Sequence, residues 1–381
     1  MNILHTSPAT NTVSWTENGT VRTADWRSES SQKPPRDLAV VHEASAADIL
    51  KRAHAQTATL WQGDFHNAKQ VLAAMKKRLR QQEKTLTADT PAEIFHQHRM
   101  RQAQQSRLLN MLAVEIHPQL TLQLPRAPDV QTALLDVYGT PNDTPFLLPL
   151  NRLLGFIGAH QWHQTGVDIP ALGGKIHVPF GVFSPLRGEY LDLVQQAPIK
   201  PEWQTASDIG TGSGVLAALL AKRGIHQVTA TDLNPKALAC ASANIRRLGL
   251  SSQIEVMEAD LFPPGKTDLI VCNPPWLPAK PTSAIEAALY DPDNAMLNSF
   301  LAQAASHLHP GGEVWLILSD LAEHLTLRSH TYLLQCIEQG GLTIIDTLSI
   351  RPRHAKATHS QDPLAPFRNQ EVTHLYRLQA M

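Results

Sequence analysis

The N-terminal half of the chain places apolar residues at the three- and four-residue spacing of amphipathic helices. The clearest run covers residues 64–83, where one face carries Phe65, Val71, Leu72, Met75 and Leu79. Ser45 and the pair Thr90-Pro91 mark helix starts, because a Ser or Thr side chain accepts hydrogen bonds from free N–H groups and proline tolerates the first turn. The pattern predicts helices over 45–58, 64–83, 90–112 and 147–163.

Three other segments of this half lack a helical period. Residues 1–37 are rich in Ser, Thr, Asn and Pro, which predicts an irregular arm. Residues 120–124 alternate between apolar and polar side chains and predict a short strand. Alternation with Gly and Pro interruptions over 174–183 predicts a β-hairpin that links two domains, with a helix over 188–196 after it.

From Trp203 onward, short apolar runs alternate with helical segments. The predicted strands cover 206–209, 227–231, 253–257, 267–272, 313–318, 342–346 and 372–378. The predicted helices cover 215–223, 234–248, 296–308 and 330–339. Such alternation is typical of an α/β sheet of mostly parallel strands with helices on both faces.

The change of pattern near residue 200 predicts two main domains, as the length of 381 residues also favours. We expect an irregular arm at 1–37 and a mainly helical domain at 38–168. A hairpin and linker follow at 169–200, and an α/β domain occupies 201–381.

The composition excludes several classes of protein. Three cysteines without a Cys-x-x-Cys pair exclude a disulfide scaffold and a Cys-based zinc site, and they fit a reducing cytoplasm. No apolar run reaches the length of a membrane span, so no membrane partner is expected. His160 and His163 are three residues apart on a predicted helix, and His96 and His98 flank Gln97, but no Cys or carboxylate cluster completes either pair. We therefore predict no metal site.

The formal net charge of −1 means that any nucleic-acid surface must be local. Residues 69–107 hold such a candidate, with nine cations against three carboxylates: Lys69, Lys76, Lys77, Arg78, Arg80, Lys84, Arg99, Arg101 and Arg107 against Glu83, Asp89 and Glu93. This segment fits a helical surface that contacts phosphates, and it fits a solvated helix face equally well. The basic loop 351–359 is a second candidate with the same two interpretations.

A glycine-rich turn, Asp208-Ile-Gly210-Thr211-Gly212-Ser-Gly214, lies between a predicted strand and a predicted helix. Glycines there allow a tight turn and let a ligand lie against bare backbone at the helix N-terminus. The glycine spacing is G-x-G-x-G. The carboxylate of Asp208, two residues before the first glycine, repels a pyrophosphate but binds a cationic ligand. Asp232 ends the next strand, 22 residues after Gly210, where its carboxylate accepts hydrogen bonds from ribose hydroxyls.

Asp260 follows the third predicted strand, whose end borders the same crevice. Its carboxylate is placed to accept from an adenine amino group, with Leu233 and Leu261 covering the ring faces. A loop-capping role for Asp260 is equally open.

Asn273-Pro274-Pro275-Trp276 follows the apolar strand that ends at Cys272. The Asn273 amide oxygen and the Pro274 carbonyl are two acceptors that together hold both hydrogens of a planar amino group, and Trp276 stacks on its π plane. This arrangement aims the nitrogen at an electrophilic methyl group and stabilises the positive charge that grows on it. The alternative is a Pro-rich turn with a packed Trp.

Taken in order, these segments resemble class I S-adenosylmethionine-dependent methyltransferases. The similarity is strongest to the branch with an Asn-Pro-Pro-aromatic motif. That branch includes glutamine methyltransferases of release factors and ribosomal proteins, and base methyltransferases of ribosomal RNA and tRNA. The resemblance covers residues 170–381 and implies a seven-stranded, mostly parallel, Rossmann-like sheet whose last strand is antiparallel.

The resemblance implies S-adenosylmethionine as cofactor. It places the turn of Asp208, Gly210, Thr211, Gly212 and Gly214 along the methionine part. It places Asp232 at the ribose, Asp260 at the adenine, and Asn273 to Trp276 at the acceptor nitrogen. Residues 183–189 stand where glutamine methyltransferases carry a Pro-Arg-Pro-Glu-Thr stretch.

The resemblance leaves the acceptor open. We favour an exocyclic amine of an RNA base, in ribosomal RNA or an assembly intermediate, with 38–168 as the substrate-recognition domain. A glutamine side chain of a release factor or ribosomal protein is the alternative, although these enzymes usually show Tyr at the position of Trp276 and have a shorter N-terminal region. A nicotinamide-dependent oxidoreductase is disfavoured by the glycine spacing and by Asn273. A non-catalytic RNA-binding or assembly protein that keeps the fold is a further alternative.

Overall fold

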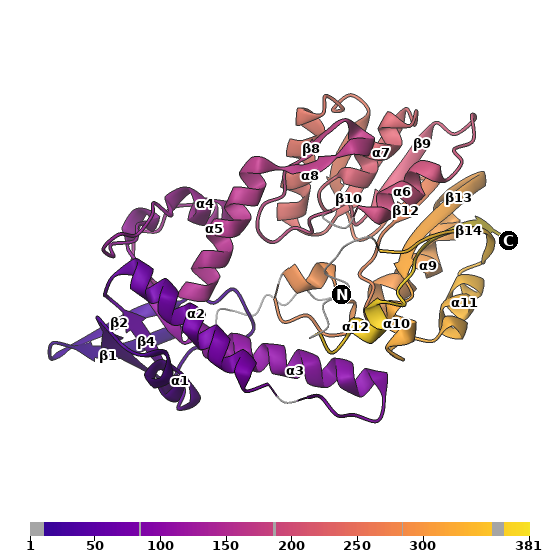
Figure 1. Cartoon of the computed structure of the whole chain (residues 1–381). Helices are drawn as coiled ribbons and strands as arrows, with labels where there is room; N and C mark the ends of the chain where they lie inside the picture. The colour runs from indigo at the N-terminus through magenta and orange to yellow at the C-terminus, as the bar shows by residue number, and fades with distance from the viewer. Residues whose placement is uncertain (1–10, 84, 186–187, 284, 353–361) are drawn as a thin grey trace. The chain divides into compact units, whose positions relative to one another are not determined.

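The computed structural model describes residues 11–83, 85–185, 188–283, 285–352 and 362–381 (Figure 1). The chain divides into two compact units. Unit 1 takes the chain up to Thr87 and then His96–Gln161. Unit 2 takes Ala88–Phe95 and Trp162–Met381.

Unit 1 contains a six-stranded mixed sheet in the order β1-β2-β6-β5-β4-β3. The strands β3 and β4, β4 and β5, and β2 and β6 are parallel, and the other neighbours are antiparallel. The bounds are β1 Thr12–Glu17, β2 Thr20–Trp26, β3 Asp37–Val41, β4 Thr57–Trp61, β5 Leu112–Ile116 and β6 Phe146–Pro149. The helices are α1 Ala46–His54, α2 Phe65–Gln81, α3 Pro91–Asn110, α4 Gln131–Tyr138 and α5 Leu150–Thr165. The division into units falls within α3 and within α5.

The prediction of an irregular arm was wrong for much of its length, because β1 and β2 form an antiparallel hairpin. Asn18 and Gly19 connect the strands with φ angles of 50° and 77°, as a tight hairpin turn requires. Trp15 and Trp26 are buried while their neighbours along the strands are more exposed. An Asn-Gly pair between alternating segments was therefore a usable signal that we missed. Residues 1–10 of the predicted arm lie outside the described residues.

The four helices predicted for this half are present, but the sheet between them was not predicted. Strands β5 and β6 are buried at every position, so they show no alternation of apolar and polar residues, and Glu115 is the one charged residue in them. The predicted strand at 120–124 was wrong: Leu120 ends the 3-10 turn Pro118–Leu120, and Thr121 makes only an isolated bridge with His117. The linker hairpin lies earlier than predicted: β7 Val167–Ile169 pairs with β8 Gly174–Ile176, and no strand follows over 177–183.

Unit 2 is built on a seven-stranded sheet in the order β11-β10-β9-β12-β13-β15-β14. β15 is antiparallel to both of its neighbours, and the other pairs are parallel. The predicted sheet with an antiparallel last strand is confirmed. The bounds are β9 Thr205–Ile209, β10 Gln227–Asp232, β11 Ile254–Glu258, β12 Thr267–Cys272, β13 Leu308–Ser319, β14 Leu342–Ile350 and β15 Thr373–Ala380.

Helices cover both faces of this sheet (Figure 1). Alternate residues of β12 show the two sides. Leu269 and Val271 join the core under α6, α7 and α8, while Ile270 and Cys272 join the core under α9 and α11. The helix bounds are α6 Glu189–Gln196, α7 Val215–Lys222, α8 Pro235–Arg247, α9 Ala295–Ala304, α10 Leu321–His324, α11 His330–Gln339 and α12 Ala365–Arg368. Within the described ranges, no helix combines the length and the apolar character needed to cross a bilayer.

Candidate active site

The carboxyl ends of three adjacent strands bring the predicted motifs together. In the register of the sheet, Asp208 of β9 pairs with Ala230 of β10 and with Val271 of β12. The glycine turn, Asp232 and Asn273 therefore lie at the same edge of the sheet, where these three strands end. In an open α/β sheet, this edge is where ligands bind.

The glycine turn is a tight backbone corner that only glycine fits well. Gly210, Gly212 and Gly214 have φ angles of 71°, 55° and 80°, which L-residues with a side chain rarely adopt. A Cβ on Gly214 would lie 3.2 Å from Ala241, so the turn packs directly on α8. A Cβ on Gly212 would meet only the Gly210 carbonyl, at 4.0 Å. The backbone at Gly212 therefore faces open space and fits a ligand lying along it.

Asp208 lies buried beneath this turn. Its Oδ2 accepts hydrogen bonds from Thr211 Oγ1 at 2.6 Å and from the Ala217 N–H at 3.0 Å. Its Oδ1 is buried and has no hydrogen-bond partner among the described residues. Burial raises the pKa of Asp208 to about 6, against the two hydrogen bonds, which lower it. A buried carboxylate with one oxygen unpaired fits a positively charged ligand group.

Asp232 at the end of β10 joins the turn to its neighbouring strand. Its Oδ2 accepts from the Gly212 N–H at 3.0 Å, and its Oδ1 accepts from the Asn234 N–H at 2.9 Å. Each carboxylate oxygen keeps a further lone pair, so the half-buried side chain fits the predicted contact with ribose hydroxyls.

The loop after β11 lies against the end of β10. Thr231 Oγ1 donates to the Leu261 carbonyl at 2.6 Å, and Leu261 has a φ angle of 71°. This left-handed conformation costs a branched side chain about 1–2 kcal/mol, and such strain gathers at binding sites. Leu233 and Asp260 are exposed at this edge. Their contact with an adenine ring stays a prediction.

Asn273 and Trp276 contact each other, which the sequence analysis did not foresee. The Trp276 indole Nε1 donates to Asn273 Oδ1 at 2.8 Å. The indole is half-buried and packs against both core clusters of the sheet, and Pro274 between the two residues is buried. The Asn273 oxygen keeps one lone pair, which can accept an N–H of the group that receives the methyl. Stacking of Trp276 on that acceptor stays a prediction.

Two buried charged residues beside this corner were missed in the sequence. Asp291 accepts from the N–H groups of Met296 at 2.9 Å and Leu297 at 3.0 Å, and so caps α9. The Met296 methyl lies against Gly210, so this cap fixes the start of α9 beside the glycine turn. An acidic residue ahead of a predicted helix was the available signal.

Arg328 is the second of these residues and is only 5% exposed. Its Nη1 lies 3.2 Å from Asn294 Oδ1 and 3.5 Å from the Trp276 carbonyl. It stands between α10 and α11 as one Arg in a short loop, with no pattern in the sequence that marks it.

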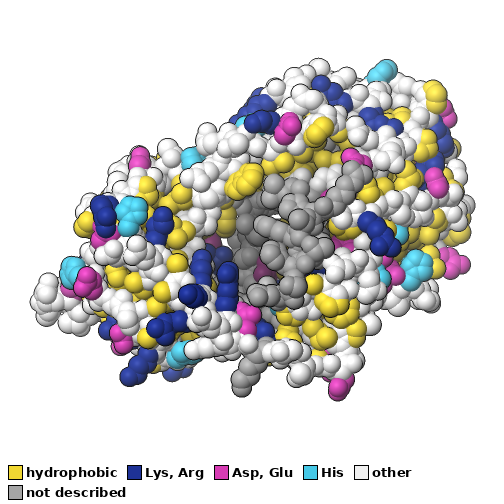
Figure 2. Space-filling view, viewed as in Figure 1, with side chains coloured by type: hydrophobic (Ala, Val, Ile, Leu, Met, Phe, Trp, Pro, Cys, Tyr) yellow, Lys and Arg dark blue, Asp and Glu magenta, His cyan; other side chains and the backbone are white. Residues whose placement is uncertain are grey.

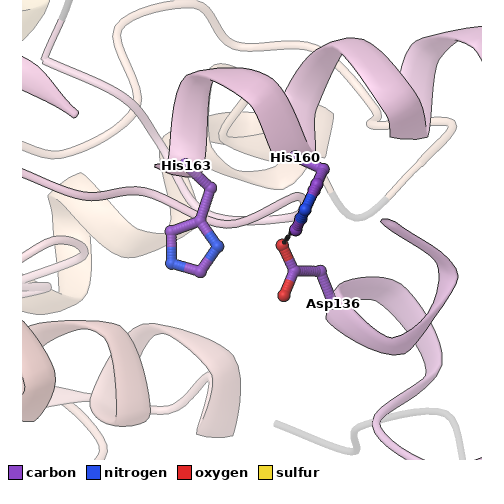
Figure 3. Close-up of side chains that lie close together, drawn as sticks. All are labelled: Asp136, His160 and His163. Atoms are coloured by element: carbon purple, nitrogen blue, oxygen red, sulfur yellow. Dashed lines mark hydrogen bonds and ion pairs between the residues drawn. The ribbon is translucent and has the colours of Figure 1, made fainter. Parts of the chain in front are cut away.

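The histidines considered as metal ligands have a carboxylate neighbour that the sequence analysis did not find. Figure 3 shows His160 of α5 turned toward Asp136 of α4, with His163 one turn further along α5. His160 Nδ1 lies 2.5 Å from Asp136 Oδ2. This hydrogen bond accounts for the position of His160 alone, and the absence of a metal stays a prediction. The loop residues 353–359, together with Lys84 and residues 186–187 of the 183–189 stretch, lie outside the described residues.

Residues 181–339 match the family model described as methyltransferase small domain. These residues lie within unit 2, which therefore resembles a methyltransferase small domain over most of its length. The predicted membership among class I S-adenosylmethionine-dependent methyltransferases, with that cofactor, is confirmed.

The names of three relatives of this chain give three different acceptors. The release factor glutamine methyltransferase of Cereibacter sphaeroides is 38% identical over 144 residues, which cover 34% of this chain and 51% of the relative. The tRNA1(Val) (adenine(37)-N6)-methyltransferase of Glaesserella parasuis is 34% identical, with coverages of 34% and 58%. The ribosomal RNA small subunit methyltransferase C of Alcanivorax borkumensis is 29% identical, with coverages of 32% and 38%. The chain thus spans about half the length of the relatives it matches.

We expect Asp232→Ala to raise the Kd for S-adenosylmethionine by about tenfold or more, because it removes charged acceptors from the ribose and releases the Gly212 N–H. Isothermal titration calorimetry measures this effect, with circular dichroism as the check on folding. Glu255→Ala, an exposed carboxylate on β11, is the matched control and should leave the Kd unchanged. Wild-type affinity in Asp232→Ala would show that the ribose assignment is wrong.

Proposed function

We propose that this protein transfers a methyl group from S-adenosylmethionine to a planar amino nitrogen, and that the acceptor is an exocyclic amine of an RNA base. The observation that carries the reaction type is the Asn273–Trp276 corner that follows β12, beside the glycine turn that follows the paired strand β9. An amide oxygen and a backbone carbonyl at that place bind an NH₂ group without an anionic base.

When bound, S-adenosylmethionine supplies a methyl carbon made electrophilic by its sulfonium. The acceptor nitrogen forms the new C–N bond as the S–C bond breaks, and the nitrogen then loses one proton to solvent. Asn273 Oδ1 and the Pro274 carbonyl each accept one N–H, which directs the nitrogen lone pair toward the methyl group. The same two oxygens stabilise the positive charge that develops on nitrogen.

A basic stripe on α2 supports RNA as the substrate. Lys69, Lys76 and Arg80 are spaced seven and four residues apart, so they share one side of the helix; we call them the α2 stripe. Within the described part of the chain, no carboxylate forms an ion pair with any of the three. Figure 2 shows dark-blue side chains gathered over α2.

The α2 stripe is held at some cost to stability. Burial and the neighbouring Arg80 lower the pKa of Lys76, and like charges four residues apart destabilise a helix by about 0.2–0.5 kcal/mol. Cations kept together without acidic partners are typical of a surface that binds phosphates.

An RNA base must be unstacked before a methyl group can reach its amine. Single-stranded loops and flipped bases meet this condition, and they commonly stack on an aromatic side chain. Trp276 supplies such a ring beside Asn273.

A glutamine side chain is the second candidate acceptor. The release factor enzyme of Cereibacter sphaeroides supports it, because a primary amide is as planar as a base amine. Asn273 and Pro274 would bind either NH₂ group in the same way.

The deciding experiment is transfer of tritiated methyl from S-adenosylmethionine into lysate of a strain that lacks this protein. We expect label that is lost with ribonuclease and survives protease. Label that survives ribonuclease and is lost with protease would make glutamine the acceptor. If no label enters either fraction, the non-catalytic alternative is favoured.

We expect Lys76→Glu with Arg80→Glu to lower kcat/KM for the RNA by about tenfold or more at about 0.1 M salt, because two phosphate contacts are lost. The salt slope of RNA binding should fall by about 1.5, and the Kd for S-adenosylmethionine should stay unchanged. The matched control is Lys33→Glu with Arg36→Glu, which changes the charge of unit 1 equally at two exposed cations. Equal losses in the two variants would remove the α2 stripe from the binding surface.

A further inference from the structure

We propose that Trp276 and Arg328 are positioning residues that fix the orientation of the Asn273 amide, so that its oxygen faces the acceptor nitrogen. This inference rests on the proposed methyl transfer, adds Arg328 to the site, and gives Trp276 a second role that acts through Asn273.

The indole N–H can pair only with the oxygen of an asparagine amide. It is a donor without acceptor capacity, whereas the two ends of the amide are an acceptor and a double donor. The 2.8 Å contact from Trp276 Nε1 therefore selects one of the two flips of Asn273. In the other flip, the Nδ2 hydrogens would face the hydrogens of the acceptor NH₂ group and repel them. Trp276 thus holds Asn273 in the flip that can accept.

Trp276 holds its position because both its ring and its backbone carbonyl are fixed by contacts. Its ring packs against the core clusters on both faces of the sheet. Its backbone carbonyl lies 3.5 Å from Arg328 Nη1, and Arg328 Nη2 lies 3.5 Å from the Ser319 carbonyl at the end of β13. Arg328 thereby connects the corner after β12 to the end of the neighbouring strand.

A strained turn beside Arg328 belongs to the same arrangement. Asp293 and Asn294 have φ angles of 56° and 54°, and two consecutive left-handed residues other than glycine need outside support. Arg328 Nη1 donates to Asn294 Oδ1 at 3.2 Å, and Asp291 caps the helix that follows. The Asp291 N–H also donates to the Leu277 carbonyl at 2.9 Å, one residue after Trp276. The buried guanidinium and this turn support the corner together.

Trp276→Phe is the variant that separates orientation from stacking, because Phe keeps an aromatic ring and loses the N–H. We expect its single-turnover rate of methyl transfer to fall by about tenfold, while its Kd values for acceptor and S-adenosylmethionine change by less than about threefold. Arg328→Lys keeps the charge but loses the forked donors of the guanidinium. Its rate should also fall while its Kd values stay nearly unchanged. A wild-type rate in Trp276→Phe would overturn the proposal.

A nuclear magnetic resonance measurement tests the contact without any substrate. The ¹⁵N-indole signal that is missing in Trp276→Phe belongs to Trp276, and Asn273→Ala should shift it. The Trp315 indole, which donates to Glu313 at 3.2 Å, is the control and should not move. An unmoved Trp276 signal would also overturn the proposal. If wild-type protein transfers no methyl group, the proposed function fails, while this signal still reports on the contact by itself.

Discussion

Replacing Asn273 by alanine should lower the rate of methyl transfer by on the order of a thousandfold, with the Kd for S-adenosylmethionine within about threefold of wild type. The side chain supplies one of two acceptors for the reacting NH₂ group, and its loss leaves the nitrogen both misaligned and without a dipole against its growing charge. Single-turnover transfer measures the rate, and calorimetry measures the affinity.

Asn273→Asp is the informative companion to that variant. A carboxylate accepts from the indole and from the acceptor NH₂ group in either flip, so this variant should lose about ten- to a hundredfold, less than Asn273→Ala. Equal losses in both variants would mean that hydrogen-bond acceptance at this position is not what the reaction needs. A wild-type rate in Asn273→Ala would remove the corner from the chemistry.

The motifs of unit 2 were predictable because they lie at strand ends. Asp208, Asp232 and Asn273 are far apart in sequence, but the parallel sheet brings their positions to one edge. Alternation of strands and helices predicts that sheet, and the strand ends then follow without further information. The indole contact to Asn273 was beyond reach, because it depends on a side-chain rotamer that no periodicity encodes.

Unit 1 was harder to predict for two different reasons. β5 and β6 are buried at every position, so their apolar runs merge with those of the neighbouring helices. The hairpin of β1 and β2 carried a usable signal in Asn18-Gly19 that its polar composition concealed. The contact between His160 and Asp136 joins two separate helices, so it cannot be predicted before the fold is known.

Asp208→Asn should make the ligand-free protein more stable than wild type, and S-adenosylmethionine should stabilise this variant less than it stabilises wild type. In the folded chain, burial raises the pKa of Asp208 from its usual 3.8 to about 6. The folded state therefore binds this proton more tightly than the unfolded state does, and the free energy of unfolding falls as the pH rises from about 4 to about 6. At neutral pH, a neutral Asn should restore about 3 kcal/mol. Chemical denaturation without ligand measures this gain, which should vanish near pH 4.

The same variant should bind S-adenosylmethionine about tenfold or more weakly, because an amide offers no charge to a cationic ligand. For wild type, the affinity should fall as the pH drops below about 6 and Asp208 takes up a proton, and for Asp208→Asn it should stay flat over that range. Glu255→Gln, at an exposed carboxylate on β11, gives the matched loss of charge. If Asp208→Asn is less stable than wild type in the absence of ligand, the buried carboxylate has a partner within the protein and is not held for a ligand.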